Sequence, residues 1–418
     1  MVANLLKPRI FIGLTDISSQ IQDLSEAFKL LGYQTITAVY QKRSVVNDTR
    51  PDYDIQEMNS RQWFANIRPY RLRLWLQKKL DAKNRVWQKA IRKCDVFIFL
   101  WDTFQPDFSD LALLKSLGKK VVTIHVGDDV RWVYAMQQEF ASYHFQPMQY
   151  DSSYFHWSSL HNKLNRLRYA EKYADLVYSR LDQAQLSLRP YHQWKMMVRP
   201  EKFTAYSNQK LQNPLVIHSP TNREIKGTQY ILEAVERLKS EGFVFEFQLF
   251  ENIPHQEALQ LYQKADIVID QLLCPGAGKF ATECLAMGKV VLAKMGYGVY
   301  PQKIAPNCPL VDVNPENIYQ VLKDLLPNHA RRQALAEAGP LFVKEHLNFH
   351  HFCKDLLEKL TSSPDTLTYD YYPSFFRQQF VPESAEALQS YNQWTAFVKD
   401  CDWYKQYVPT GERDGLIF

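Results

Sequence analysis

One segment of the chain, DIVIDQLLCPGAGKFATECLAMGK, has the order of residue types that can bind a phosphate group. Residues 266–272 predict a buried strand, a loop with Gly276 and Gly278 follows, and residues 280–287 predict a helix. The backbone N–H groups of such a loop, together with the positive end of the helix, attract anions. We therefore expect Gly276, Gly278 and Lys279 to contribute to a site for a phosphate-containing ligand.

Two common phosphate motifs fit this segment poorly. A Walker loop is excluded, because the position six before Lys279 is Leu273 rather than glycine, and Phe280 follows the lysine in place of serine or threonine. The letters GAGKFA do fit a dinucleotide fingerprint that ends in alanine. That fingerprint needs an acid at the end of the next strand, where this chain has Lys294. A dinucleotide site is therefore the minor alternative.

Several further segments, in the same order along the chain, carry a resemblance to a known family. IHSPTNREIKGTQYILEAVERL, ADIVIDQLL, GKFATECLAMGKVV and LVDVNPENIYQVLKDLL resemble the nucleotide-sugar-binding half of GT-B glycosyltransferases of family 4. Residues 95–131 resemble the amino-terminal half of the same proteins, and the resemblance covers residues 5–350. It implies an α/β fold of two doubly wound Rossmann-like domains facing a central cleft. It also implies a nucleoside diphosphate sugar as donor substrate and no cofactor.

The resemblance assigns roles in donor binding. Glu283 stands where the family glutamate accepts hydrogen bonds from the ribose hydroxyls. Lys226 stands where a cation meets the diphosphate, and Arg223 is a second candidate, since positive charge there stabilises the departing nucleoside diphosphate. Two positions depart from the family. Pro275 replaces the acidic residue of many retaining members, so a carboxylate near the sugar is missing or comes from elsewhere. Thr221 replaces the usual arginine.

The amino-terminal half contributes a second group of polar residues. His125 ends an expected strand and resembles a family histidine that lines the sugar site, although it lies two residues before Gly127, where a spacing of one is commoner. We expect His125 and Asp128 to be catalytic residues and Asp129 and Arg131 to lie on the acceptor side. The alternatives are a structural histidine at a strand end and an aspartate that caps the next helix.

The elements that position these residues follow from the hydrophobic pattern. Continuous apolar runs separated by amphipathic helical segments predict parallel sheets covered on both faces, with strands at residues 9–13, 33–40, 95–101, 120–126, 214–218, 243–250, 266–272 and 289–294. We expect one domain at 1–200 and a second at 201–362. The segment 363–418 contains thirteen aromatic residues and is expected to pack back on the body.

Residues 61–93 depart from this scheme because they are strongly basic. They contain eleven Lys or Arg against one acid, Asp81, and the aromatic residues Trp63, Phe64, Trp75 and Trp87. One interpretation is a solvated helix face, since apolar residues follow a core-facing stripe. The other is a patch that binds an anionic membrane surface. A nucleic-acid site is a weaker third interpretation.

Composition sets the outer limits of the function. The 418 residues are 46% apolar and 23% charged, which is typical of a globular protein of two domains. No window approaches the roughly 18 to 20 apolar residues that span a membrane. Six scattered cysteines without a CxxC pair indicate a reducing compartment and no structural zinc. The net charge of +5 does not indicate a nucleic-acid-binding protein, and the histidines of EHLNFHHF are expected to lie on a helix rather than bind metal.

These observations predict a cytoplasmic, metal-independent GT-B glycosyltransferase that transfers a hexose from a nucleoside diphosphate sugar to a hydroxyl group. Retention of configuration rests on the resemblance alone. Residues 61–93 suggest peripheral membrane association, a lipid-linked acceptor and a place in polysaccharide or glycolipid biosynthesis. A nucleotide-sugar epimerase of the same fold is one alternative. A non-catalytic GT-B scaffold is the other, on account of Pro275 and the shifted His125. The sequence does not give the sugar, the base, the acceptor or the oligomeric state.

Overall fold

The structure is a computed structural model. It describes residues 7–42, 50–60, 81–139, 150–183, 185–187, 189–207, 209–295, 305, 307–363, 366–371, 400, 405 and 410. The chain forms two compact units, and each is described by itself. Unit 1 comprises Met1–Met136, Asp151–Trp194 and Cys353–Phe418. Unit 2 comprises Gln137–Tyr150 and Lys195–Phe352. The sequence placed the domain boundaries after residues 200 and 362, and the structure divides the chain after Trp194 and Phe352.

A parallel sheet of eight strands forms the centre of unit 1. The strands are β1 (Ile10–Asp16), β2 (Thr35–Val39), β3 (Gln41–Lys42), β4 (Tyr53–Asp54), β5 (Val96–Leu100), β6 (Lys120–His125), β7 (Leu176–Ser179) and β8 (His192–Gln193). Their order is β4-β2-β1-β5-β6-β7-β8, and β3 pairs with β1 beside this path. β1, β5 and the apolar part of β6 are buried along their length, as expected for a sheet covered on both faces.

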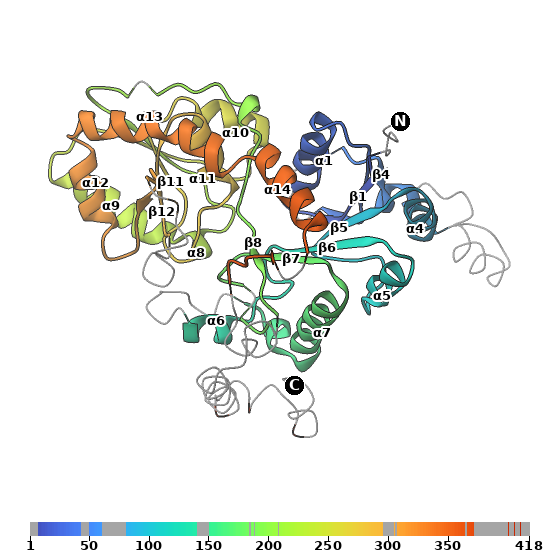
Figure 1. Cartoon of the computed structure of the whole chain (residues 1–418). Helices are drawn as coiled ribbons and strands as arrows, with labels where there is room; N and C mark the ends of the chain where they lie inside the picture. The colour runs from blue at the N-terminus through green and yellow to red at the C-terminus, as the bar shows by residue number, and fades with distance from the viewer. Residues whose placement is uncertain are drawn as a thin grey trace. The chain divides into compact units, whose positions relative to one another are not determined.

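Helices connect and cover these strands. They are α1 (Gln20–Leu30), α2 (Ile55–Ser60), α4 (Ala82–Lys93), α5 (Ser109–Ser116), α6 (Val133–Glu139), the 3-10 helix η3 (Ser152–Phe155) and α7 (Trp157–Tyr173). Figure 1 shows α1 on one side of the central strands and α5 and α7 on the other. The arrangement is doubly wound, as the sequence predicted. It also brings the loops after β1 and β5 next to each other at one edge of the sheet.

Residues from the end of the chain complete unit 1. The helix α14 (Phe349–Thr361) leads into it, and residues 366–371 pack along β8. Tyr191 and Tyr371 form an antiparallel bridge, the backbone N–H of Gln193 donates to Asp370 Oδ2 at 2.8 Å, and the rings of His192 and Tyr369 stack at 4.9 Å. This part of the aromatic carboxyl-terminal segment packs back on the body. Most of the remainder lies outside the described residues.

Unit 2 contains a second parallel sheet, of five strands. The strands are β9 (Leu215–His218), β10 (Glu246–Leu249), β11 (Ile267–Ile269), β12 (Val290–Ala293) and β13 (Val311–Asp312), in the order β10-β9-β11-β12-β13. Its helices are the 3-10 helix η4 (Pro200–Lys202), α8 (Arg223–Lys226), α9 (Thr228–Ser240), α10 (His255–Tyr262), α11 (Lys279–Ala286), α12 (Ile318–Leu325) and α13 (His329–His346).

Alternate residues of the central strands enter the two halves of the core of unit 2. Ile267 and Ile269 pack with α9 and α12 on one face of the sheet. Val268 between them packs with α10 and α11 on the other face. A strand that is apolar at every position, as β11 is, can exist only between two helical layers. The sheet therefore fixes the position of the loop that leaves β11 and of the helix that follows it.

The search for a membrane-crossing helix gave none within the residues that the structure describes.

Candidate active site

The chain reverses its direction across the sheet of unit 2 between β9 and β11. From β9 it moves outward to β10, and α10 then brings it back past β9 to β11. In open parallel sheets the crevice at the carboxyl ends of the strands at such a point is where ligands bind. The loops that leave β9 and β11, at residues 219–227 and 270–278, contain most of the predicted donor-binding residues. The geometry of these two loops therefore decides what the site can do.

Lys226 joins the two loops. It ends α8, and its Nζ lies 2.5 Å from Asp270 Oδ1 and 2.9 Å from Gln271 Oε1. Its side chain is 14% exposed, whereas that of Asp270 is 0% exposed. The resemblance implies a cation that meets a diphosphate, and the structure gives this cation a buried carboxylate partner. An ammonium has three donors, and two of them are used here.

Glycine is required at the turn after Lys226. Gly227 has a φ of 72°, in the left-handed region, and this conformation ends α8 and begins α9. A Cβ atom at Gly227 would also lie 3.1 Å from Leu272 Cβ and 3.3 Å from Leu273 Cγ. The close packing of the β9 loop on the β11 loop holds Lys226 above the crevice.

The glycine loop before α11 is tied to its own surroundings. The N–H of Gly278 donates to Asp270 Oδ2 at 2.8 Å, and the N–H of Gly276 donates to the carbonyl oxygen of Lys294 at 2.8 Å. These two groups were expected to face a phosphate, and in the structure each has a protein acceptor. The N-cap residue of α11, which begins at Lys279, is Gly278, and glycine has no side chain with which to cap the helix. The anion-attracting feature of this loop is therefore the amino end of α11 rather than the glycine N–H groups.

Glu283 lies one turn inside α11 and is 2% exposed. The His255 Nε2 atom, at the start of α10, lies 3.0 Å from both carboxylate oxygens. Each carboxylate oxygen has a further lone pair, so the pair with His255 leaves acceptor capacity for hydroxyl groups. This burial supports the interpretation of Glu283 as a ligand-binding residue over that of a solvated helix residue.

Arg223 and His218 lie near the loop that leaves β9 and differ in their exposure. Arg223 is 54% exposed and pairs with Glu251 at 2.5 Å, an exposed contact that a ligand phosphate can compete for. His218 ends β9 and is completely buried. Its Nδ1 donates to the carbonyl oxygen of Ile269 at 2.7 Å, and its Nε2 accepts from the Thr228 hydroxyl at 2.8 Å. His218 thus binds β9 to β11 and to the start of α9.

Unit 1 holds the second group of predicted residues, at the carboxyl end of β6. His125 Nδ1 lies 3.0 Å from Asp129 Oδ2, and Asp129 Oδ1 accepts the backbone N–H groups of Val126 and Gly127 at 3.2 and 2.9 Å. An ionised Asp129 makes Nδ1 the donor and leaves the lone pair of His125 on Nε2. Asp129 itself is buried, so any influence on an acceptor would be exerted through His125.

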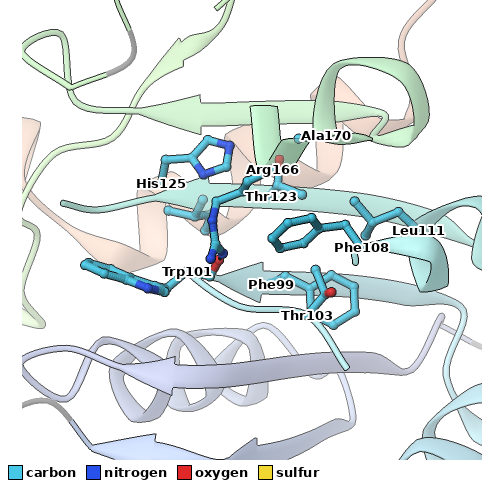
Figure 2. A pocket seen from close by; sticks show the side chains of 10 residues that line it. Phe99, Trp101, Thr103, Phe108, Leu111, Thr123, His125, Arg166 and Ala170 are labelled. Atoms are coloured by element: carbon cyan, nitrogen blue, oxygen red, sulfur yellow. The ribbon is translucent and has the colours of Figure 1, made fainter. Parts of the chain in front are cut away.

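A small cavity lies beside His125, between β5, β6 and the helices α5 and α7. Figure 2 shows His125, Thr123 and Arg166 around it, with Phe99 and Phe108 forming an apolar wall. His125 Nε2, Thr123 Oγ1 and Arg166 Nε are buried, and within the described residues they have no hydrogen-bond partner. Polar atoms in this arrangement match one hydroxyl group or one ordered water molecule.

Asp128 and Arg131 are not among the residues that line this cavity. Arg131 pairs with Asp128 at 3.2 Å and with Asp182 at 3.6 Å. Asp128 is 40% exposed, and its carbonyl oxygen accepts a hydrogen bond from the buried Lys163. Burial lowers the pKa of Lys163 to about 8, against the opposing influence of Asp128 and Asp129. Asp128, unlike Asp129, is therefore accessible to a ligand.

The basic segment is described only from Asp81 onward. Asp81 caps α4 and accepts the backbone N–H of Asn84. Trp87 is 6% exposed and its ring lies 4.8 Å from that of Phe104, so this tryptophan is a core residue and not one that reaches a membrane interface. The basic residues on the outer face of α4 are exposed: Arg85, Lys89, Arg92 and Lys93. Residues 61–80 lie outside the described residues.

The expected absence of a metal site stays a prediction. His346 ends α13, and its ring lies 4.9 Å from that of Phe342 and is tilted against it, while His350 and His351 lie on α14. Within the described ranges, no group of three or more His, Cys, Asp or Glu side chains is arranged to hold a metal ion.

Sequence reasoning missed the residues that pair with the predicted ones. Asp270, His255, His218, Lys163 and Arg166 were not assigned roles. Two of them had one usable signal: His218 ends an apolar strand and Asp270 directly follows one, both at the expected ligand-binding edge of the sheet. The other three carry no local signal, because they reach their partners from helices that begin far away in the sequence.

Comparisons with known proteins identify the fold. No protein-family model and no curated protein matches the chain. Among solved structures, a sucrose-phosphate synthase from Thermosynechococcus elongatus is 12% identical, with 84% of this chain and 98% of that chain covered and a TM-score of 0.53. An alpha-glucosyltransferase in complex with UDP and a 13-mer DNA is 13% identical, with 85% and 100% covered and a TM-score of 0.53. The GT-B fold predicted from the sequence is thus confirmed, and membership of family 4 stays a prediction.

Proposed function

We propose that the chain is a glycosyltransferase that moves a hexose from a nucleoside diphosphate sugar to a hydroxyl group. The observation that carries this proposal is the group of side chains at the carboxyl edge of the sheet of unit 2. A buried carboxylate, Glu283, a lysine, Lys226, and the amino end of α11 lie at the switch point of a Rossmann-like sheet. The fold that the chain shares with an alpha-glucosyltransferase solved in complex with UDP supports it.

Each group has a task that follows from its chemistry. The remaining donor of Lys226 and the positive end of α11 are suited to the oxygens of a diphosphate, whose negative charge grows as the sugar departs. Glu283, held by His255, is suited to accept hydrogen bonds from the ribose hydroxyls. Because Lys226 and Arg223 both have carboxylate partners, their net contribution to binding an anion is smaller than that of unpaired cations.

The finer parts of the proposal concern the reaction and its acceptor. We propose retention of configuration and independence of a metal ion, both implied by the family resemblance. For the acceptor we propose a lipid or lipid-linked hydroxyl reached at a membrane surface from the cytoplasm. The exposed basic face of α4 supports it, whereas the buried Trp87 removes one of the tryptophans on which it rested. His125, with its lone pair beside a small polar cavity, and the exposed Asp128 remain the candidate catalytic residues of unit 1.

Isothermal calorimetry tests the donor site directly. The wild-type protein is titrated with UDP, GDP and ADP at millimolar concentration, and at least one should bind. Glu283→Ala should weaken that binding, whereas Glu257→Ala, an exposed glutamate on α10, is the matched control and should not. If none of the nucleotides binds, the donor-site assignment fails.

A non-catalytic scaffold is the second candidate. Two features favour it. Lys226 and Arg223 are both paired with carboxylates. Pro275 stands where a charged residue is expected near the sugar. Slow hydrolysis of a nucleotide sugar in the absence of acceptor separates the two candidates: an enzyme releases nucleoside diphosphate, and a scaffold binds the sugar nucleotide unchanged. The epimerase alternative would instead yield a second nucleotide sugar.

A further inference from the structure

Asp270 occupies an unusual position in unit 2. It follows β11 at the carboxyl edge of the sheet, at the switch point, and its side chain is 0% exposed. Both of its oxygens are used, Oδ1 by Lys226 Nζ at 2.5 Å and Oδ2 by the N–H of Gly278 at 2.8 Å. One carboxylate therefore holds a residue from each of the two loops that border the crevice.

A buried ion pair of this kind is a poor means of stabilising a fold. Removing two charges from water costs free energy that the attraction between them barely offsets, and apolar residues of similar size often serve as well. The neighbouring residues of β11 are apolar and pack in two complete core clusters, so the sheet does not need a carboxylate here. The pair has a clearer use in fixing the position of Lys226.

The geometry around Gly278 agrees with a shaped site. A Cβ atom at this position would lie 3.0 Å from Asp270 Oδ2 and 3.6 Å from Lys226 Nζ. The absence of a side chain thus lets the backbone at the start of α11 approach both members of the pair. Lys226 Nζ and the amino end of α11 lie close together as a result, and Asp270 contacts both.

We propose that Asp270 is the positioning residue for the phosphate-binding end of the donor site. It orients Lys226 so that the remaining ammonium donor faces the crevice, and it holds Gly278 so that α11 begins at the same place. The ligand it serves is the terminal phosphate of a nucleoside diphosphate. This inference rests on the proposed function, because it presumes that a nucleoside diphosphate binds in this crevice.

A ladder of ligands isolates the phosphate contribution. The affinities of a nucleoside, its monophosphate and its diphosphate are measured by calorimetry, for the base that wild-type protein prefers. In Asp270→Asn the gain in affinity from monophosphate to diphosphate should fall by about tenfold, the scale of one charged hydrogen bond, while the affinity for the nucleoside is unchanged.

The same strand offers a matched control. Asp266, at the opposite end of β11, is equally buried and accepts the backbone N–H groups of Lys210 and Leu215 at 2.7 and 2.8 Å. Asp266→Asn should leave the ladder unchanged. If Asp270→Asn fails to fold, Gly278→Ala is measured in its place, since the added methyl group displaces the carboxylate without removing a charge. This variant should also lower the gain in affinity from monophosphate to diphosphate.

The outcomes separate three explanations. If Asp270 merely neutralised Lys226, Asp270→Asn would bind diphosphate more tightly than wild type, and the proposal would be overturned. An unchanged ladder in both Asp270→Asn and Gly278→Ala would overturn it as well. If the wild-type protein binds no nucleotide at all, the proposed function fails before the role of Asp270 is reached.

Discussion

Acid should destabilise unit 2 through His218. This residue is completely buried, and its two ring nitrogens bond the carbonyl oxygen of Ile269 and the hydroxyl of Thr228 in a way that requires the neutral ring. Burial, assisted by the positive charge of Lys226, lowers the pKa of His218 from 6.5 to about 4. The folded form therefore binds fewer protons than the unfolded form throughout the interval between these two values.

The sign and size of the effect follow from this difference. The stability that the neutral histidine provides is complete above pH 6.5 and is lost as the pH falls toward 4. A difference of about 2.5 pH units, at about 1.4 kcal/mol per unit, corresponds to about 3.5 kcal/mol of unfolding free energy, of which most is lost by pH 4. His218→Gln has no titrating ring, so unit 2 of this variant should lose about 3 kcal/mol less than wild type between pH 7 and pH 4.

Two probes distinguish the two units in this measurement. None of the nine tryptophans lies in residues 137–150 or 195–352, so urea unfolding followed by tryptophan fluorescence reports on unit 1. Far-ultraviolet circular dichroism reports on both units. His192 of unit 1, whose pKa burial lowers to about 4, gives the fluorescence signal its own acid dependence and serves as the internal control. Equal acid sensitivity of wild type and His218→Gln in the circular dichroism transition of unit 2 would refute the reasoning.

The remaining predictions concern ligands and a membrane surface. Glu283→Ala should weaken nucleoside diphosphate binding by about 1 to 3 kcal/mol, the scale of a lost charged hydrogen bond. His255→Ala should reduce the preference for UDP over its 2′-deoxy form, and an unchanged preference would make His255 a packing residue only. Turnover should persist in EDTA, and its loss on chelation with recovery on adding magnesium or manganese would contradict the metal-independent proposal. Binding to anionic vesicles should weaken as salt rises from 0.1 M to 1 M, because the Debye length falls from about 10 Å to about 3 Å. Trp87→Phe should not alter vesicle binding, since this ring is buried, and equal binding to neutral vesicles would favour a soluble acceptor.

Local pattern was sufficient to locate many of the elements around the donor crevice. The helix expected at 280–287 is observed at Lys279–Ala286, and the apolar run 266–272 contains the strand Ile267–Ile269. Both elements have their apolar residues in a short window with the correct period, and both ends coincide with glycines or polar residues. Fold class followed from the repetition of such windows.

The pairing of side chains was not predictable in the same way. Lys226 and Asp270 are 44 positions apart, and their contact depends on the parallel register of β9 with β11, in which Ile217 lies opposite Val268. His255 reaches Glu283 across 28 positions, from the start of one helix to the side of another. Such contacts depend on how whole elements pack. The sequence therefore proposed Lys226 and Glu283 as site residues, and only the structure gave their partners.

Because unit 1 is built from separate parts of the chain, the order of synthesis affects when each unit can fold. Residues 195–352 of unit 2 emerge as one continuous piece, so this part of its fold can form soon after its last strand and helix leave the exit tunnel. Unit 1 emerges first but has to wait, because the residues that pack along β8, from Tyr369 to Tyr371, are translated after all of unit 2. During that interval Tyr191 and His192 lack their final covering, and β8 is exposed to chaperones and to misassociation.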